Sequence, residues 1–191
     1  MSDWVFDRDA IRAFRFVRCG FDAATGMARL VYAFDDGPEL VETVTLPGAP
    51  FELDAARADA AERALRLLHL IAGVSYYKAA VPAEIRIDGY AIDAATATLL
   101  ETVYLNGLGE FAYRNGLDLR GRIRFPRADD AAVPAPGLDL REHALVAIGG
   151  GKDSLVSIEA LRAEGVAQTV TWIGGSPLIA ASLMRECDRI V

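Results

Sequence analysis

Cysteine is scarce in this sequence: Cys19 and Cys187 are the only two among 191 residues. They stand far apart and have no metal-ligating neighbours at short spacing, so the sequence gives no sign of a disulfide framework or a zinc site. Isolated thiols of this kind are typical of a reducing compartment. We therefore expect a cytoplasmic protein.

Long apolar segments and an excess of basic charge are also lacking. Arg66 and His69 interrupt the best candidate for a membrane-spanning stretch, and the acidic residues 1–7 contain neither a basic leader nor an apolar core segment. Lys and Arg number 20 against 27 Asp and Glu, whereas general nucleic-acid binding requires a basic face. The sequence therefore predicts neither a membrane partner nor a nucleic-acid partner.

What is present is an ordinary globular composition, with 52% hydrophobic and 25% charged residues. The first part of the chain, residues 1–126, predicts an α+β domain. Its residues 12–21, 27–34 and 40–46 have the composition of strands and are separated by turn residues such as glycine, aspartate and proline. This pattern predicts an antiparallel meander.

The same domain should contain a long helix that packs on the meander. We expect it over residues 54–72, with Asp54 as its N-cap and Gly73 as its C-terminal stop. The apolar face expected to meet the sheet consists of Ala60, Ala64, Leu67, Leu68 and Ile71. A further strand over 84–88 and helices over 93–105 and 109–115 complete the predicted domain.

A second, different domain is predicted after a linker. Residues 127–140 are rich in alanine, proline and aspartate without periodicity, and residues 141–191 then follow a β-α-β-α pattern. The expected elements are strands over 144–148 and 168–173 and helices over 152–164 and 177–186. Strands that are apolar on both faces favour a parallel sheet. Because an open nucleotide-binding sheet usually needs about 100–150 residues, we expect this domain to be incomplete and the chain to be truncated.

The most informative segment joins the first strand of this second domain to the helix that follows. An apolar run leads into Gly149, Gly150 and Gly151, and helical spacing begins at Lys152. Glycines let the main chain approach a phosphate closely, and the free N–H groups of the first helical turn point towards it. The segment therefore predicts an anion site.

Two common phosphate loops do not fit this segment. A Walker loop ending at Lys152 would have Val146 in place of its first glycine and Asp153 in place of its hydroxyl residue. A dinucleotide fingerprint would have Ser154 in place of its third glycine and a carboxylate beside the pyrophosphate. The segment instead resembles the ATP-pyrophosphatase loop, Ser-Gly-Gly-x-Asp-Ser.

That resemblance implies an α/β ATP-pyrophosphatase domain, of the adenine nucleotide alpha hydrolase-like type, that binds ATP and Mg²⁺. Asp153 would hold Mg²⁺ against the phosphates, Ser154 would donate its hydroxyl, and Lys152 would add a positive charge. Gly149 stands where the family usually has serine, so one hydroxyl donor is missing. A glycine-rich turn in which Ser154 caps the helix is the alternative. Besides Asp153, the implied nucleotide-binding residues are Gly149, Gly150, Gly151, Lys152, Ser154, Trp172 and Ile173, the last two through backbone contacts with adenine.

Outside the loop, the candidates for chemistry are weaker. Tyr76, Tyr77 and Lys78 follow the predicted helix stop and are candidates for a substrate groove or a proton donor, although such aromatic residues more often pack on the core. His69 lies in the long helix and is expected to pack or to lie at the surface. His143 precedes the loop strand, where it could approach a nucleotide.

A basic stretch stands out in this acidic chain, and two interpretations of it stay open. It comprises Arg114, Arg120, Arg122, Arg124 and Arg127. Guanidinium groups suit a diphosphate or a carboxylate, which they bind through paired hydrogen bonds. The alternation of these arginines with Leu119, Ile123 and Phe125 favours instead the solvated side of a strand.

Three segments together resemble one bacterial family. They are residues 71–79 (IAGVSYYKA), residues 104–113 (YLNGLGEFAY), and residues 147–154 taken with 171–176. The family is the UDP-N-acetyl-muramoyl-L-alanyl-L-glutamate epimerase of peptidoglycan synthesis. The similarity covers the whole chain and implies the N-terminal domain of that enzyme followed by the start of its ATP-binding domain.

The resemblance implies an isomerase that uses ATP. It would convert the terminal L-Glu of UDP-MurNAc-L-Ala-L-Glu to D-Glu and release AMP and diphosphate. Two other functions remain open: another ATP pyrophosphatase that adenylates a substrate for amide or thio transfer, and a non-catalytic remnant that keeps only the fold. The scarcity of cysteine and the excess of acidic over basic residues count against another ATP pyrophosphatase.

Overall fold

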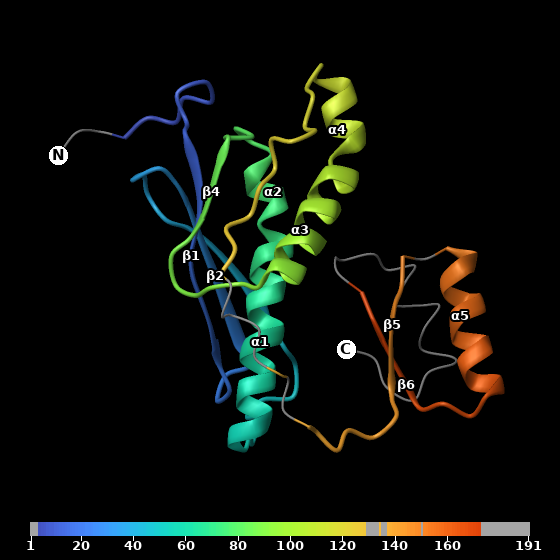
Figure 1. The fold of residues 1–191 in the computed structure, drawn as a ribbon. Coiled ribbons are helices and arrows are strands. Elements are labelled where there is room, and N and C mark those ends of the chain that lie inside the picture. Colours follow the sequence, from blue (N-terminus) through green and yellow to red (C-terminus); the bar gives the residue numbers. More distant parts are fainter. Residues whose placement is uncertain (1–3, 129–133, 135–136, 150, 173–191) are drawn as a thin grey trace. The chain divides into compact units, whose positions relative to one another are not determined.

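The computed structural model describes residues 4–128, 134, 137–149 and 151–172. The chain divides into two compact units, Met1–Gly137 and Leu138–Val191 (Figure 1). Each unit has its own sheet and its own hydrophobic core. The units are therefore described separately.

The first unit is built on a four-stranded sheet. Its strands are β1 (Ala13–Asp22), β2 (Met27–Phe34), β3 (Leu40–Thr45) and β4 (Glu84–Ile87), in the order β3-β2-β1-β4. The β1–β2 and β2–β3 pairs are antiparallel, which confirms the predicted meander, and β4 runs parallel to β1 at the edge. Strand boundaries lie within one residue of those predicted from apolar–polar alternation, because that alternation is a local signal.

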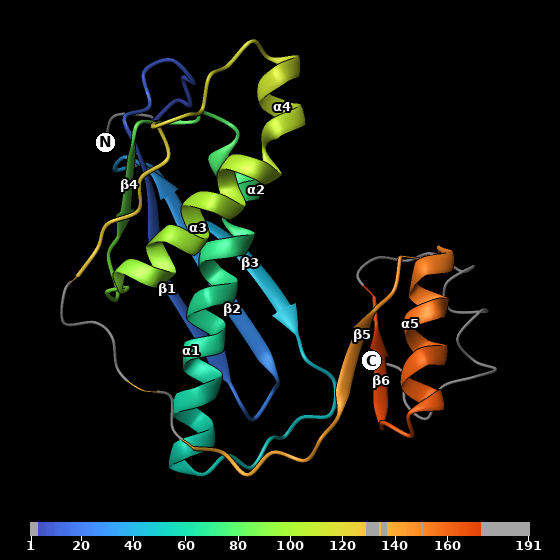
Figure 2. The same cartoon turned by 45° about the vertical axis from the view of Figure 1, so that its right-hand side comes forward.

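Four helices accompany this sheet. They are α1 (Ala55–Ala72), α2 (Val74–Tyr77), α3 (Ala94–Gly107) and α4 (Gly109–Arg114). Helix α1 lies across one face of the sheet and α3 packs beside α1 (Figure 2). The predicted N-cap is confirmed, since the Asp54 carboxylate accepts the Arg57 N–H at 2.8 Å. The first unit is thus the α+β domain that the sequence predicts.

The apolar face predicted for α1 is largely wrong. The buried residues of the helix are Leu65, His69 and Leu70, whereas Leu68 and Ile71 are 42% and 37% exposed. The helix is rotated relative to its most apolar stripe because His69 can enter the core. Both of its ring nitrogens find hydrogen-bond partners there, as described below, and a satisfied polar group can be buried at little cost.

Gly73 is the C-cap of α1, as predicted, but it does not end the helix through a left-handed turn. Its φ is −57°, a right-handed helical value, and α2 follows directly. A Cβ at this position would overlap the ring of Phe16. Glycine stands here because the end of α1 approaches β1 closely, not because the backbone turns left-handed.

The core of the first unit is an aromatic cluster whose hydroxyl groups satisfy the end of α1. The Tyr32 hydroxyl donates to the His69 carbonyl at 3.0 Å, and the Tyr104 hydroxyl donates to the Leu70 carbonyl at 2.6 Å. Both tyrosines are fully buried. Carbonyls in the last turn of a helix commonly lack intrahelical partners. Here the His69 carbonyl also accepts the Gly73 N–H at 3.2 Å, whereas the Leu70 carbonyl is met by the Tyr104 hydroxyl.

In its described residues, 138–149 and 151–172, the second unit contains a parallel pair of strands and one helix. Strands β5 (Ala144–Ala147) and β6 (Gln168–Thr171) pair in parallel, and α5 (Lys152–Ala163) packs on them through Val146, Ile158 and Val170 (Figure 1). The parallel pairing and the helix agree with the sequence pattern. The predicted helix 177–186 and the last residue of the predicted strand 168–173 lie outside the described residues.

Removing one of the buried hydroxyls tests the role assigned to the tyrosines. We expect Tyr104→Phe to lower the free energy of unfolding by about 1–3 kcal/mol, because the buried Leu70 carbonyl loses its partner. The control Tyr113→Phe removes a hydroxyl from a side chain that is 88% exposed and should change little. Urea unfolding of both variants provides the measurement, and equal effects would contradict the assignment.

Candidate functional site

The glycine loop lies between a paired strand and a helix N-terminus. Strand β5 ends at Ala147, the Ile148 N–H still donates to the Thr171 carbonyl at 2.9 Å, and α5 begins at Lys152. Gly151 is the N-cap, with φ −94° and ψ 167°, and no side chain caps the helix. The first-turn N–H groups of α5 therefore face outward without a side-chain acceptor at the N-cap, which is the local geometry of an anion site.

Neither packing nor backbone conformation requires glycine at Gly149 or Gly151. A Cβ built at either position meets no atom within 4 Å, and neither residue has a positive φ. By contrast, Gly26 has φ +72°, and a Cβ there would overlap the Leu46 carbonyl oxygen. The same openness surrounds Gly20, Gly107 and Gly109, so the open space at the loop leaves room for the close approach of a ligand without by itself requiring one. Gly150 lies outside the described residues.

The loop has three polar side chains: Ser154 makes a contact within the loop, and Lys152 and Asp153 face solvent. The Ser154 hydroxyl accepts the Gly149 N–H at 3.4 Å, a long bond that closes the loop. Gly149 precedes the N-cap Gly151, so this contact caps no helical N–H and does not support the capping alternative for Ser154. Lys152 and Asp153 are exposed, and within the described part of the chain no cation pairs with Asp153.

The donor set at the loop fits Mg²⁺ bound together with phosphates. No group of three or more potential metal-ligating side chains occurs among the described residues, so a dedicated protein cage is absent from that part of the chain. Mg²⁺ in nucleotide sites typically takes one or two carboxylates, and the phosphates supply further oxygen ligands. Asp153, exposed in the first turn of α5, can fill the carboxylate position, and Ser154 can add a hydroxyl.

Trp172 leaves the sheet at the same edge as the loop. The parallel register pairs Ala147 with Thr171, so the chain exits β5 and β6 side by side. The Trp172 side chain is partly buried against the small core of Val146, Ile158 and Val170. The structure therefore brings Trp172 to the carboxyl edge of the sheet, where ligands collect in open α/β sheets. Ile173 lies outside the described residues.

Two of the three candidates at residues 76–78 have structural partners in the first unit. The Tyr77 side chain is fully buried in α2 and its hydroxyl donates to the Pro82 carbonyl at 3.1 Å. Burial raises the pKa of Tyr77 to about 12. The Tyr76 hydroxyl donates to Glu42 at 2.7 Å, which raises its pKa, and Lys78 is exposed. Tyr77 is thus a core residue.

The two histidines also have structural partners. The Nε2 atom of His69 faces the Val31 carbonyl at 3.0 Å and must carry the hydrogen, which leaves Nδ1, 3.0 Å from the Tyr90 hydroxyl, as an acceptor. His69 is fully buried, so of the two expected alternatives, packing and a surface position, the structure shows packing. His143 lies 2.7 Å from the Thr169 hydroxyl at the amino end of β5, opposite to the glycine loop.

The arginine-rich segment is a loop in the structure, which corrects the strand interpretation. Residues 115–128 form no strand, and Gly121 turns the chain with φ +71°. Burial nevertheless alternates as predicted, with Leu119, Ile123 and Phe125 inside and the arginines exposed. The alternation therefore reflects anchoring of a loop on the core rather than pairing in a sheet.

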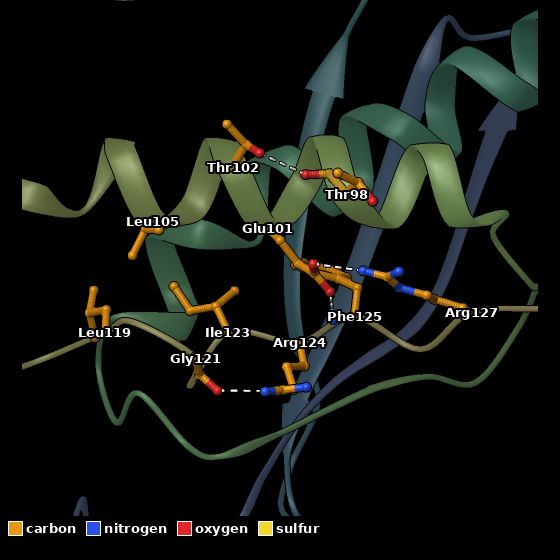
Figure 3. Close-up of a pocket in the computed structure, with 10 residues that line it drawn as sticks. All are labelled: Thr98, Glu101, Thr102, Leu105, Leu119, Gly121, Ile123, Arg124, Phe125 and Arg127. Carbon is orange, nitrogen blue, oxygen red and sulfur yellow. Dashed lines mark hydrogen bonds and ion pairs between the residues drawn. The ribbon is translucent and has the colours of Figure 1, made fainter.

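The arginines of this segment differ in their surroundings. Arg114 and Arg120 pair with the nearby Glu110 and Asp118, whereas Arg124 and Arg127 line a cavity of about 540 Å³ beside α3 (Figure 3). Sequence reasoning did not find this cavity, because its walls come from two segments that meet only in the fold. The one sequence signal that pointed to the cavity was the spacing of Thr98, Thr102 and Leu105, which places these three lining residues along one side of α3.

Comparisons with known proteins point to one family. A family model described as the MurL N-terminal domain matches residues 5–189. A protein of Xanthomonas oryzae pv. oryzae, named UDP-N-acetyl-alpha-D-muramoyl-L-alanyl-L-glutamate epimerase, is 70% identical over 180 residues, which are 94% of this chain and 40% of the relative. A protein of Salinispora tropica with the same name is 38% identical over 195 residues. The match covers 94% of this chain and 42% of the relative.

A third relative of that name, from a Micromonospora species, is 40% identical over 161 residues, covering 81% of this chain and 35% of the relative. The chain thus spans about two fifths of the length of the curated relatives that it matches. No solved structure gives a significant match. In the described part of the chain, no helix is both long and apolar enough to cross a membrane.

A pair of glycine substitutions tests whether the loop is free of structural constraint. We expect Gly149→Ser to change the free energy of unfolding by no more than about 0.5 kcal/mol, because its side chain would enter open space. Gly26→Ser should cost at least about 1–2 kcal/mol, since a left-handed backbone disfavours a side chain. Denaturant unfolding followed by circular dichroism compares the two, and a comparable loss in both would show that Gly149 is needed for folding.

Proposed function

This chain belongs to the MurL N-terminal domain family, and on that premise we propose that it supplies the nucleotide-binding loop of an ATP-dependent epimerase. The proposed reaction inverts the terminal L-Glu of UDP-MurNAc-L-Ala-L-Glu to D-Glu, in peptidoglycan synthesis. Its relatives carry the name of this epimerase, and the chain covers the N-terminal two fifths of their length.

The need for ATP follows from the acidity of the carbon that must be inverted. A Cα–H next to an ionised carboxylate is very weakly acidic, because its removal would produce a dianion. Converting the carboxylate to an acyl-adenylate removes that charge and makes the carbonyl an electron acceptor. A base on one face and an acid on the other could then exchange the proton.

In this proposal, the residues of the loop hold the phosphates that leave as diphosphate. The main-chain N–H groups at the start of α5 bind phosphate oxygens, and Lys152 contributes a positive charge from the same turn. Asp153 would hold Mg²⁺, which neutralises the charge that develops on the diphosphate. The Ser154 hydroxyl, now 3.4 Å from the Gly149 nitrogen, lies at the mouth of the loop and could turn towards an oxygen.

One observation carries the proposal more than any other. Gly149 and Gly151 occupy open space in an ordinary backbone conformation, so neither the fold nor the turn accounts for the absence of side chains. Their position between a parallel strand and a helix N-terminus is the arrangement that binds phosphates in other folds. A phosphate-bearing ligand at this point accounts for both facts together.

Binding of ATP to this chain can be measured directly. We expect isothermal titration with ATP and Mg²⁺ to give saturable heat, and Asp153→Asn to weaken binding about tenfold, because a carboxylate oxygen on the metal is lost. Without Mg²⁺, the wild-type chain and the variant should bind ATP equally weakly.

Glu164→Gln is the matched control for that experiment. It removes one negative charge from an exposed residue at the other end of α5 and should leave ATP binding unchanged. Absence of saturable heat in the wild-type chain would favour a non-catalytic remnant. Equal weakening by the two substitutions would remove Asp153 from its proposed role.

A further inference from the structure

The cavity beside α3 has walls of two chemical kinds. Figure 3 shows it between α3 and the loop that follows Leu119, and all its lining residues belong to the first unit. The apolar part of the lining consists of Leu105, Leu119, Ile123 and Phe125. The other lining side chains carry guanidinium, carboxylate and hydroxyl groups, and both α3 and the loop contribute to each kind. At about 540 Å³ the cavity is within the size range of small-molecule sites.

One guanidinium of the cavity is fixed in place by the fold. The Arg127 side chain donates to Glu101 at 2.9 Å, and the other carboxylate oxygen of Glu101 accepts the Phe125 N–H at 3.1 Å. Glu101 is therefore held between a side chain and the main chain, and it holds Arg127 in turn. Such a guanidinium loses less conformational entropy on binding a ligand than a freely moving one.

The second guanidinium lacks a counter-ion. Arg124 donates through Nε to the Gly121 carbonyl at 3.1 Å, and no carboxylate pairs with it anywhere in the described ranges. Its two terminal nitrogens are left to bind an external acceptor. The cavity therefore has two cationic groups against one carboxylate, in a chain whose net charge is −7. A local positive excess of this kind favours an anion.

The hydroxyl groups of the cavity are arranged as acceptors. The Thr98 hydroxyl donates to the Ala94 carbonyl at 2.8 Å, and the Thr102 hydroxyl donates to the Thr98 carbonyl at 2.9 Å. Each hydroxyl hydrogen is used within α3, so its oxygen presents lone pairs to the cavity. These oxygens can accept hydrogen bonds from N–H or O–H groups of a ligand.

We infer that this cavity is a substrate-anchoring site in which Arg124 and Arg127 bind an oxyanion, phosphate or carboxylate, of a ligand that also carries N–H or O–H donors. The apolar wall would take the body of that ligand, and Thr98 and Thr102 would accept its donors. The assignment rests on the proposed function, because the proposed substrate has a nucleoside diphosphate at one end and an acidic dipeptide at the other. Either end satisfies the chemistry of the cavity.

Titration of the 191-residue chain with two probes, each alone, distinguishes the sources of the oxyanion. UDP tests the nucleotide end and L-Ala-L-Glu tests the peptide end, both in EDTA so that metal-dependent binding at the glycine loop is suppressed. We expect saturable binding of one probe and a loss of at least about tenfold in affinity for Arg124→Gln, because a charge-assisted pair of hydrogen bonds is removed. Leu105→Trp, which fills the cavity from its rim, should weaken the same probe.

Two controls separate this site from general charge and from the loop. Arg114→Gln removes the same charge from an exposed arginine outside the cavity and should leave affinity within about twofold. Lys152→Gln, which removes the metal-independent charge proposed at the loop, should also leave probe binding intact, so failure of the ATP proposal would not be confused with failure of this one. Binding of neither probe, or equal losses in Arg124→Gln and Arg114→Gln, would overturn the assignment.

Discussion

The first unit depends on how the carbonyl end of α1 is satisfied without water. Its last turns are buried under the sheet and α3, where an unpartnered carbonyl would cost about 1–3 kcal/mol. Hydroxyls from β2 and α3 meet these carbonyls, through Tyr32 at His69 and Tyr104 at Leu70. Because the two tyrosines come from different elements, the end of α1 fixes where both of those elements must lie.

The same cluster positions the proposed anchoring site. The ring of Tyr104 packs edge-on against Phe125 with centroids 5.1 Å apart, and Phe125 also contacts Phe16 of β1. Arg124 and Arg127 flank Phe125 in the chain, so an aromatic anchor in the core holds the loop that carries them. The hydrogen bond from the Phe125 N–H to Glu101 ties the loop to α3 as well. A rigid backbone beneath side chains that are themselves held by hydrogen bonds, as Glu101 holds Arg127, is the usual basis of a preorganised site.

The parts of the fold that could be predicted are those specified by local signals. Alternation gave the three strands of the meander, Asp54 gave the start of α1, and the glycine loop was located from its own residues. The burial of His69 could not be predicted in this way, because it depends on Val31 and Tyr90, which are distant in the sequence. The cavity was missed for the same reason: Glu101 and Arg127 come together only when α3 and the later loop pack.

The open space around Gly149 and Gly151 has a consequence for how this family can be studied across species. At most positions in a protein, tolerance of mutation mixes the demands of folding with those of function. At these two positions the fold imposes no steric demand, so under the proposed phosphate binding the substitutions accepted over evolutionary time should record what the ligand allows. Natural variation at this turn would then report on ligand geometry, and lineages that have lost the proposed chemistry should be recognisable by side chains appearing there first.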